Sequence, residues 1–348
     1  MTIGVGLVGY GLGGRAFHAP YVQATPGMAL RAVVSRQADR VLADHPQVQV
    51  VDSVDRLLEQ PGIDLVIVSS PDALHADHAR AALEAGKHVV VDKPFATRRE
   101  DAAAIAHLAR TKGLVATAFQ NRRWDADFLT LRRIMADGLL GEIVQYESHF
   151  DRWRPHPADN WKEAREGGSW MDLGPHLVDQ AIALFGLPIA ITADIAALRP
   201  GAPAPDYFHA VLRYPTMRAI LHSSKSVADH GLRFAVHGRD GSWIKHGTDP
   251  QEAQALAGAV PGAAADWGVD PDEGVHVSGD APGVRRALPN ERGDYPAFWR
   301  QVAAAIATGA PNPVPADDAV AVMQMLHAGL ESAASGRAIM IAADRGVP

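Results

Sequence analysis

Asp172 and His176 have the residue types and the spacing to move a proton. They are four residues apart, which places both side chains on one face of a helix. A histidine with its ordinary pKa of about 6.5 exchanges a proton at neutral pH, and the carboxylate could orient it or bind a substrate hydroxyl. Gly174 and Pro175 disfavour a helix interior, so we expect Asp172 near a helix start, where the helix dipole favours a carboxylate.

Lys93 could add a positive charge to this chemistry. It follows the apolar run His88–Val91 and precedes Pro94, which biases the lysine backbone toward an extended conformation. A lysine ammonium can stabilise a negative charge that develops on a substrate oxygen, and it can act as a base if burial lowers its pKa.

His176 and Asp179 also carry side chains that can ligate a metal. We nevertheless expect no metal here. The sequence offers no third ligand at a convincing spacing, and hydride transfer does not require a metal.

A glycine motif begins the chain. The sequence Gly9-Tyr10-Gly11-Leu12-Gly13-Gly14 contains G-x-G-x-x-G directly after the apolar run Ile3–Val8 and before a helical pattern. Gly9 would allow the tight turn, Gly11 the approach of a pyrophosphate, and Gly14 the close packing of helix on strand. The backbone of Leu12 and Gly13 would then meet the phosphates at the start of the helix.

The end of the second apolar run bears on the choice of dinucleotide. NAD enzymes usually place a carboxylate there, on the ribose 2′-hydroxyl. This sequence has Ser35 and Arg36 instead, which could bind a 2′-phosphate. We therefore predict NADP; if Arg36 is only a solvated charge, Asp39 could serve the hydroxyl of NAD. Further cofactor contacts are expected at the carboxyl edge of the sheet, from Ser70, His75, Asp92, Lys93 and Asn121.

These residues need a parallel sheet to position them. Short Val- and Ile-rich runs (Ile3–Val8, Leu30–Val34, Leu65–Val68, His88–Val91 and Val115–Ala118) alternate with helical patterns (Leu12–Thr25, Ala38–Ala43, Val54–Glu59, Ala76–Ala85 and Arg99–Lys112). This alternation predicts a Rossmann domain over residues 1–122. The overall class is therefore α/β.

Residues 123–348 predict an α+β domain with an open, mainly antiparallel sheet, for substrate binding and oligomerisation. Helices are expected at Asp125–Ala136 and Gly168–Phe185, an extended stretch at Glu142–Phe150, and antiparallel strands between Ile189 and Ile244. Gln254–Gly293 is rich in Gly, Pro and Asp and is expected to be mostly loop. Two helices, Tyr295–Thr308 and Asp317–Ser335, close the chain and could pack back on the first domain.

The composition bounds the partners. The net charge of −7, with no basic face, argues against nucleic acid or an anionic membrane. No apolar run approaches the ~20 residues that cross a bilayer. The absence of cysteine excludes disulfides and thiolate chemistry and fits a cytoplasmic protein.

The sequence resembles the Gfo/Idh/MocA family of sugar and cyclitol dehydrogenases over essentially its whole length. The resemblance rests on Ser70-Pro71-Asp72-Ala73-Leu74-His75, Ala82–Val89, Asp92-Lys93-Pro94, Gly167-Gly168-Ser169, Asp172-Leu173-Gly174-Pro175-His176 and Asp179. Family members usually carry Glu-Lys-Pro where this chain has Asp92-Lys93-Pro94. The resemblance implies that Lys93 contacts both substrate and nicotinamide, and that the reaction is oxidation of an alcohol. Such a reaction needs a base for the hydroxyl proton and a positive group for the developing alkoxide. On this basis we predict His176 as the acid or base, Lys93 as the alkoxide stabiliser and Asp172 as the orienting group. Lys93 would be the base instead if burial lowers its pKa, and both assignments stay open. A narrower resemblance, to the branch of the family that contains NADP-dependent scyllo-inositol dehydrogenases, rests on Phe119–Asp125, Phe234–Gly238 and Glu291–Pro296.

A polyol would need many hydrogen-bonding partners, and the loop after Phe150 is rich in Arg, Asp, Asn and Trp. The candidate substrate residues are Asn121, Arg123, Arg152, Asp159, Asn160 and Trp161. An open sheet needs a cover, so we expect a homodimer or homotetramer.

The expected function is NADP-dependent interconversion of a secondary alcohol of a cyclic polyol or sugar, scyllo-inositol-like, with its ketone. The alternatives are a reductase of a keto-sugar or another substrate, and a non-catalytic dinucleotide sensor that regulates a partner.

Overall fold

The structure, a computed structural model, describes residues 2–158, 161–164, 166–229 and 231–342. The chain divides into two compact units: residues 1–124 with 250–268 and 294–323, and residues 125–249 with 269–293 and 324–348. The later segments join the first unit by hydrogen bonds to one carbonyl. The Trp124 oxygen accepts from Asp294 N at 2.9 Å and from Gln251 Nε2 at 3.0 Å. The predicted boundary after residue 122 places residues 250–268 and 294–323 in the second domain, whereas they belong to the first unit.

Six parallel strands form the sheet of the first unit in the order β3-β2-β1-β4-β5-β6, which is the Rossmann order. They are β1 (Ile3–Val8), β2 (Met28–Val34), β3 (Gln49–Val51), β4 (Leu65–Val68), β5 (His88–Val91) and β6 (Ala116–Ala118). β1 and β4 are buried along their whole length, as strands between two helical layers must be. The predicted Rossmann domain is confirmed.

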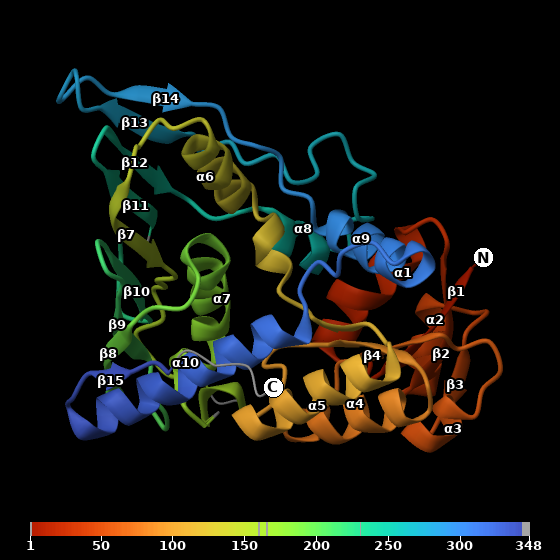
Figure 1. Ribbon diagram of the computed structural model, residues 1–348. Helices are drawn as coiled ribbons and strands as arrows, with labels where there is room; N and C mark the ends of the chain where they lie inside the picture. The colour runs from red at the N-terminus through yellow and green to blue at the C-terminus, as the bar shows by residue number, and fades with distance from the viewer. Residues whose placement is uncertain (1, 159–160, 165, 230, 343–348) are drawn as a thin grey trace. The chain divides into compact units, whose positions relative to one another are not determined.

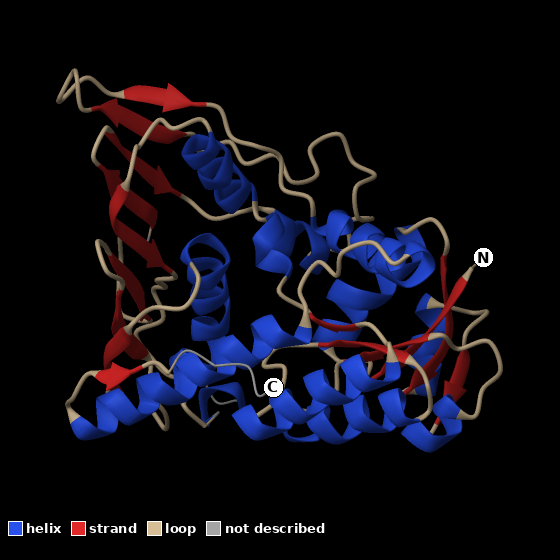
Figure 2. Cartoon of the chain, in the orientation of Figure 1, coloured by secondary structure: helices blue, strands red, loops and turns tan. Residues whose placement is uncertain are grey.

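Helices cover both faces of this sheet, with α4 and α5 on one face and α1 and α9 on the other (Figures 1 and 2). The helical segments of the unit are the π-helical turn η1 (Gly14–His18), α1 (Ala19–Ala24), α2 (Ala38–Asp44), α3 (Val54–Leu58), η2 (Asp72–Leu74), α4 (His75–Glu84), α5 (Arg99–Lys112), η3 (Asn121–Trp124), α8 (Gln251–Leu256), α9 (Tyr295–Thr308) and the start of α10 (Ala316–Ser335). α9 begins where it does because Asp294 caps it, accepting from Ala297 N at 3.1 Å.

Nine strands form the sheet of the second unit in the order β14-β13-β12-β11-β7-β10-β9-β8-β15. They are β7 (Ile143–His149), β8 (Ala190–Ala196), β9 (Tyr207–Arg213), β10 (Arg218–Ser224), β11 (Leu232–Gly238), β12 (Gly241–His246), β13 (Gly274–Ser278), β14 (Arg286–Leu288) and β15 (Ile339–Met340). Neighbours are antiparallel except β7 and β10, which run parallel. The mainly antiparallel sheet is therefore confirmed.

The helices of the second unit lie on one face of this sheet (Figure 1). They are α6 (Ala126–Ala136), α7 (Gly168–Phe185) and the end of α10, and a short turn η4 (Trp161–Ala164) precedes α7. Trp170 on α7 is fully buried and donates from Nε1 to the Leu326 carbonyl of α10 at 2.9 Å. Arg233 on β11 is also fully buried, and it donates to Asp127 of α6, Ser148 of β7 and Gln180 of α7.

Of two expectations about these segments, one is confirmed and one was wrong. Gln254–Gly293 is mostly loop, as expected, although the short strands β13 and β14 within it extend the sheet. Pro175 does not belong to a helix start: α7 begins at Gly168, so the proline lies inside the helix and Asp172 lies one turn in. The helix begins early because Gly167 and Gly168 adopt positive φ angles of 70° and 53°, which suit glycine, and a side chain at 168 would collide with the Pro205 carbonyl.

No helix in the described ranges is both long enough and apolar enough to span a membrane.

Candidate functional site

The glycine turn has two glycines that the fold requires and one that it does not. A Cβ at Gly9, where φ is 98°, would lie 2.4 Å from the Ser69 carbonyl oxygen. A Cβ at Gly14 would lie 2.2 Å from the Gly9 oxygen, so this glycine lets the helix approach the strand. A Cβ at Gly11 would meet no atom of the described chain within 4 Å. The open side of Gly11 is where the backbone can receive a phosphate.

The next two residues continue this cradle. Leu12 is 55% exposed, and Gly13, the N-cap residue of η1, has no side chain that could cap the helix start. Space beside Gly13 is closed, because a Cβ there would lie 2.7 Å from Ser69 Oγ and 2.8 Å from Asp92 Oδ2. Bare backbone at a helix N-terminus suits an anionic group. The turn therefore fits a dinucleotide.

Asp92 connects the glycine turn to Lys93. Its Oδ2 accepts from Ser69 Oγ and contacts His18 Nε2, both at 3.1 Å, and its Oδ1 accepts from the Lys93 backbone N at 2.8 Å. Burial alone would raise the pKa of Asp92. The hydrogen bond and charge of His18, the charge of His75 and the Lys93 N–H outweigh burial and lower the pKa well below its usual range. An ionised Asp92 therefore holds the backbone of Lys93 beside the turn.

His18 is a residue that the sequence argument missed. It ends the π-helical turn η1, is fully buried, and packs against Phe119 and Trp299 with ring centroids 4.4 and 5.7 Å away. The sequence did offer one signal for this residue: His18 is a polar residue on the apolar face of the helix that follows the glycine motif. Its partner Asp92 is far along the chain, so the contact itself was not readable.

His75 links the turn after Lys93 to the end of β4. It is buried, with Nδ1 2.7 Å from the Pro94 carbonyl and Nε2 2.8 Å from the Ser70 carbonyl. Both ring nitrogens are thus engaged with backbone, which gives His75 a positioning role for the turn after Lys93. Ser70 itself contacts His78 Nδ1 through Oγ at 3.0 Å.

The end of β2 carries no carboxylate. Ser35 Oγ accepts from Gln37 N at 3.0 Å, a local turn that fixes the serine. Arg36 is exposed, and Asp39 lies on α2, also exposed. The guanidinium is therefore the charged group at the strand tip itself.

Of the two candidates in η3, Asn121 is buried and Arg123 is already paired. Arg123 Nη2 lies 2.9 Å from Asp318 Oδ2, and its Nη1 donates to the Pro313 carbonyl at 3.4 Å. These contacts tie η3 to the segment before α10. They give Arg123 a structural task within the first unit, which makes it the weakest of the substrate candidates.

The second unit carries the remaining candidates. Asp172 and His176 lie one turn apart on α7, as predicted; His176 is buried and Asp172 is half-buried. Arg152 donates from Nη1 to the Asp151 carbonyl at 2.8 Å and lies 5.8 Å from the Phe150 ring. Asp159 and Asn160 fall outside the described residues, and Trp161 is described only as the first residue of η4.

The structure thus brings together two groups of predicted residues. The first unit joins the glycine turn, Asp92, Lys93, Ser70 and His75 at the carboxyl ends of β1, β4 and β5. The second unit joins Asp172 and His176 on α7.

Comparison with known proteins agrees with this architecture. Residues 3–119 match the family model described as "Oxidoreductase family, NAD-binding Rossmann fold", and residues 132–341 match "Oxidoreductase family, C-terminal alpha/beta domain".

Two curated relatives are similar over nearly their full length. The chain is 47% identical to the uncharacterized oxidoreductase YdgJ of Escherichia coli, over 95% of this chain and 96% of the relative. It is 36% identical to scyllo-inositol 2-dehydrogenase (NADP(+)) IolW of Bacillus subtilis, over 98% and 96%. Among solved structures, an oxidoreductase of Bacillus cereus superimposes with a TM-score of 0.89 at 32% identity, covering 98% of this chain and 99% of that one. With both domains matched in this order, the chain belongs to the Gfo/Idh/MocA oxidoreductase family.

Proposed function

We propose that this chain is an NADP-dependent dehydrogenase of a cyclic polyol or sugar, with scyllo-inositol as the type of substrate. The observation that carries the proposal is the position of Asp92 between the glycine turn and Lys93. Its carboxylate adjoins Gly13 and holds the Lys93 backbone at 2.8 Å. The backbone of Lys93 is thereby held next to the turn that fits a dinucleotide, and an alcohol dehydrogenase needs a cation near its dinucleotide.

NADP is proposed over NAD for two reasons. The tip of β2 carries the exposed Arg36 in place of a carboxylate, and a guanidinium suits a 2′-phosphate. The relative IolW is named as an NADP(+) enzyme at 36% identity. Bound NADP⁺ would supply the hydride acceptor.

The chain's own groups account for the proton. His176 or Lys93 would accept the hydroxyl proton and bound NADP⁺ would accept the hydride, so that an alcohol and NADP⁺ would give a ketone, NADPH and H⁺. Lys93 stabilises the developing alkoxide, and Asp172 orients His176 or binds a second hydroxyl. Asn121, Arg152, Asp159, Asn160 and Trp161 are proposed to select the polyol.

A homo-oligomer is proposed as well. The face of the second sheet opposite α6 and α7 presents half-buried apolar side chains such as Val211, Ile220 and Ile244. Burial of this face by a second copy would remove it from water. A light-scattering mass of one chain at micromolar concentration would refute this part of the proposal.

The deciding experiment is a panel of inositols and aldoses with NADP⁺ and NAD⁺, and of keto-sugars with NADPH. Turnover of an inositol that is clearly faster with NADP⁺ supports the proposal. Turnover of keto-sugars alone would replace it with a reductase. Tight dinucleotide binding without turnover of any compound would favour a sensor.

A further inference from the structure

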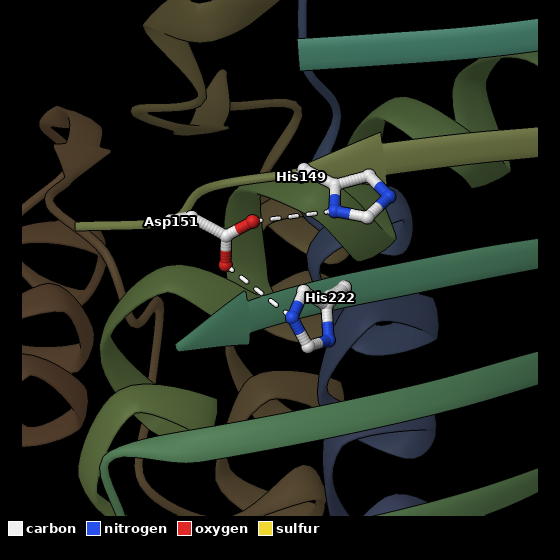
Figure 3. A group of neighbouring side chains, drawn as sticks. All are labelled: His149, Asp151 and His222. Atoms are coloured by element: carbon white, nitrogen blue, oxygen red, sulfur yellow. Dashed lines mark hydrogen bonds and ion pairs between the residues drawn. The ribbon is translucent and has the colours of Figure 1, made fainter. Parts of the chain in front are cut away.

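Two histidines and one aspartate converge where β7 and β10 end in the second unit. His149 is the last residue of β7, Asp151 follows two residues later, and His222 pairs with His149 across the parallel strands. Figure 3 shows both imidazoles turned toward the carboxylate of Asp151. The imidazole rings of His149 and His222 lie 5.1 Å apart. None of the three belongs to the site proposed for the dinucleotide.

The spacing of the three side chains suits a shared ion. His149 Nδ1 is 3.3 Å from Asp151 Oδ2, and His222 Nε2 is 3.4 Å from Asp151 Oδ1. Ligands bound tetrahedrally at about 2.0–2.1 Å lie about 3.3–3.4 Å from one another. One nitrogen of each histidine and an oxygen of Asp151 lie within 4.8 Å of one another, which an ion can bridge.

The surroundings orient these side chains as outer partners orient metal ligands. The second nitrogen of His149, Nε2, lies 3.4 Å from Glu147 Oε2, and Glu147 is itself bonded to Gln145. Asp151 Oδ1 accepts from the Ser224 backbone N at 2.8 Å. A carboxylate behind a ligating histidine fixes its ring and raises its basicity.

The cluster therefore offers two imidazole nitrogens and a carboxylate oxygen at a spacing that one ion can bridge.

We propose that His149, Asp151 and His222 bind one Zn²⁺ ion per chain. Imidazole and carboxylate are ligands that zinc accepts, and three protein ligands leave a fourth position for water or a small ligand. The ion would join the end of β7 to the end of β10. Asp151 directly precedes Arg152, whose backbone N bonds the Ser224 carbonyl at 2.8 Å, so the ion would also anchor the start of the Arg- and Trp-rich loop.

The test uses the full chain without an affinity tag, treated with EDTA and dialysed. Isothermal titration with ZnCl₂ is expected to show one site per chain, and CoCl₂ is expected to give the visible absorption of a four-coordinate ion. His149→Gln, Asp151→Asn and His222→Gln are each expected to weaken Zn²⁺ binding at least tenfold. His237→Ala is the matched control: it removes a histidine of neighbouring β11 that bonds Ser242 at 2.8 Å, and binding should not change.

Circular dichroism of each variant shows whether it has folded, and three separate substitutions keep the test decisive if one does not fold. Zn²⁺ is also expected to raise the Tm of the wild type and not of the three variants. Absence of Zn²⁺ binding by the wild type at micromolar concentration would overturn the proposal. So would equal binding by the wild type and the folded variants, which would place the ion elsewhere.

Discussion

His18 Nε2 lies 3.1 Å from Asp92 Oδ2, and this contact joins the helix after the glycine turn to the residue before Lys93. The two residues are far apart in sequence, and His18 is completely buried. Asp92 therefore positions both the helix that follows the dinucleotide turn and the backbone of the proposed catalytic lysine. Changes at Asp92 should act on stability and on Lys93 together.

Asp92→Asn is expected to lower the free energy of unfolding by about 1–3 kcal/mol at pH 7, because it weakens hydrogen bonds to a charged group. The folded pKa of Asp92 is lowered, so its contribution is complete above the unfolded pKa of about 3.9 and is lost as the pH falls from there through the folded pKa. Urea unfolding at pH 7, 5, 3.5 and 2 should show that the advantage of the wild type over the variant begins to shrink near pH 3.5 and is smaller at pH 2. A wild-type advantage that stays constant down to pH 2 would contradict this. Asp92→Glu keeps the carboxylate and should keep activity.

Gly11→Ala and Gly14→Ala should fail in different ways. Alanine at position 11 has space in the fold but occupies the open side of the turn, so folding should stay normal while the Kd for NADP rises at least tenfold. Alanine at position 14 would collide with the Gly9 carbonyl and should cost about 1–3 kcal/mol of stability. Thermal unfolding and fluorescence titration with NADPH separate the two effects. Equal Kd values for wild type and Gly11→Ala would remove the turn from the cofactor site.

Arg36→Ala should change the cofactor preference. Loss of a charged contact to a 2′-phosphate should reduce kcat/KM for NADP about tenfold or more and leave kcat/KM for NAD nearly unchanged. Arg31→Ala is the control, because Arg31 is an exposed arginine of the same strand, away from its tip. Steady-state kinetics with both cofactors measure the ratio. A ratio that does not change would reassign Arg36 to a solvated surface charge.

Lys93→Met and His176→Ala should each lower kcat by about 10²–10⁴-fold, as loss of a proton-transfer or charge-stabilising group does. Dinucleotide binding should change only severalfold, since the glycine turn is intact. The pH profile of kcat/KM distinguishes the two roles: removal of the true base abolishes the limb that reports its ionisation. Activity within tenfold of the wild type would exclude the substituted residue from catalysis.

Asp127→Ala should cost about 3–5 kcal/mol of stability, because it leaves the Arg233 charge buried without its ion-pair partner. Arg233 Nε lies 3.1 Å from Asp127 Oδ2, both side chains are fully buried, and the guanidinium lies 3.9 Å from the Phe234 ring centre. The exposed pair Arg56 and Glu59 is the comparison, and Arg56→Ala should cost less than about 1 kcal/mol. Chemical denaturation measures both. Similar losses of unfolding free energy for the two variants would show that burial does not determine how much an ion pair contributes to stability.

The sequence predicted those elements whose pattern is local and strong. β1, β4, β5, α5, α7 and α9 were expected within a residue or so of where they lie, because their apolar residues repeat with a regular period or follow clear glycine and proline signals. β3, β13 and β14 were missed. They are short strands at or next to sheet edges, and their pairing depends on a neighbour rather than on their own residues.

The sequence by itself determined the family, the Rossmann turn and the identity of the candidate residues Lys93, Asp172 and His176, because each depends on residue type and spacing within a short segment. Tertiary structure decided which of those residues have support and what other sites exist. His18 reaches Asp92, and His149 and Asp151 meet His222, only because strand order brings distant segments together. Bringing such distant residues together costs loop-closure entropy, which is offset by the packing of the whole core and not by the residues in contact. A local sequence pattern therefore does not predict these contacts.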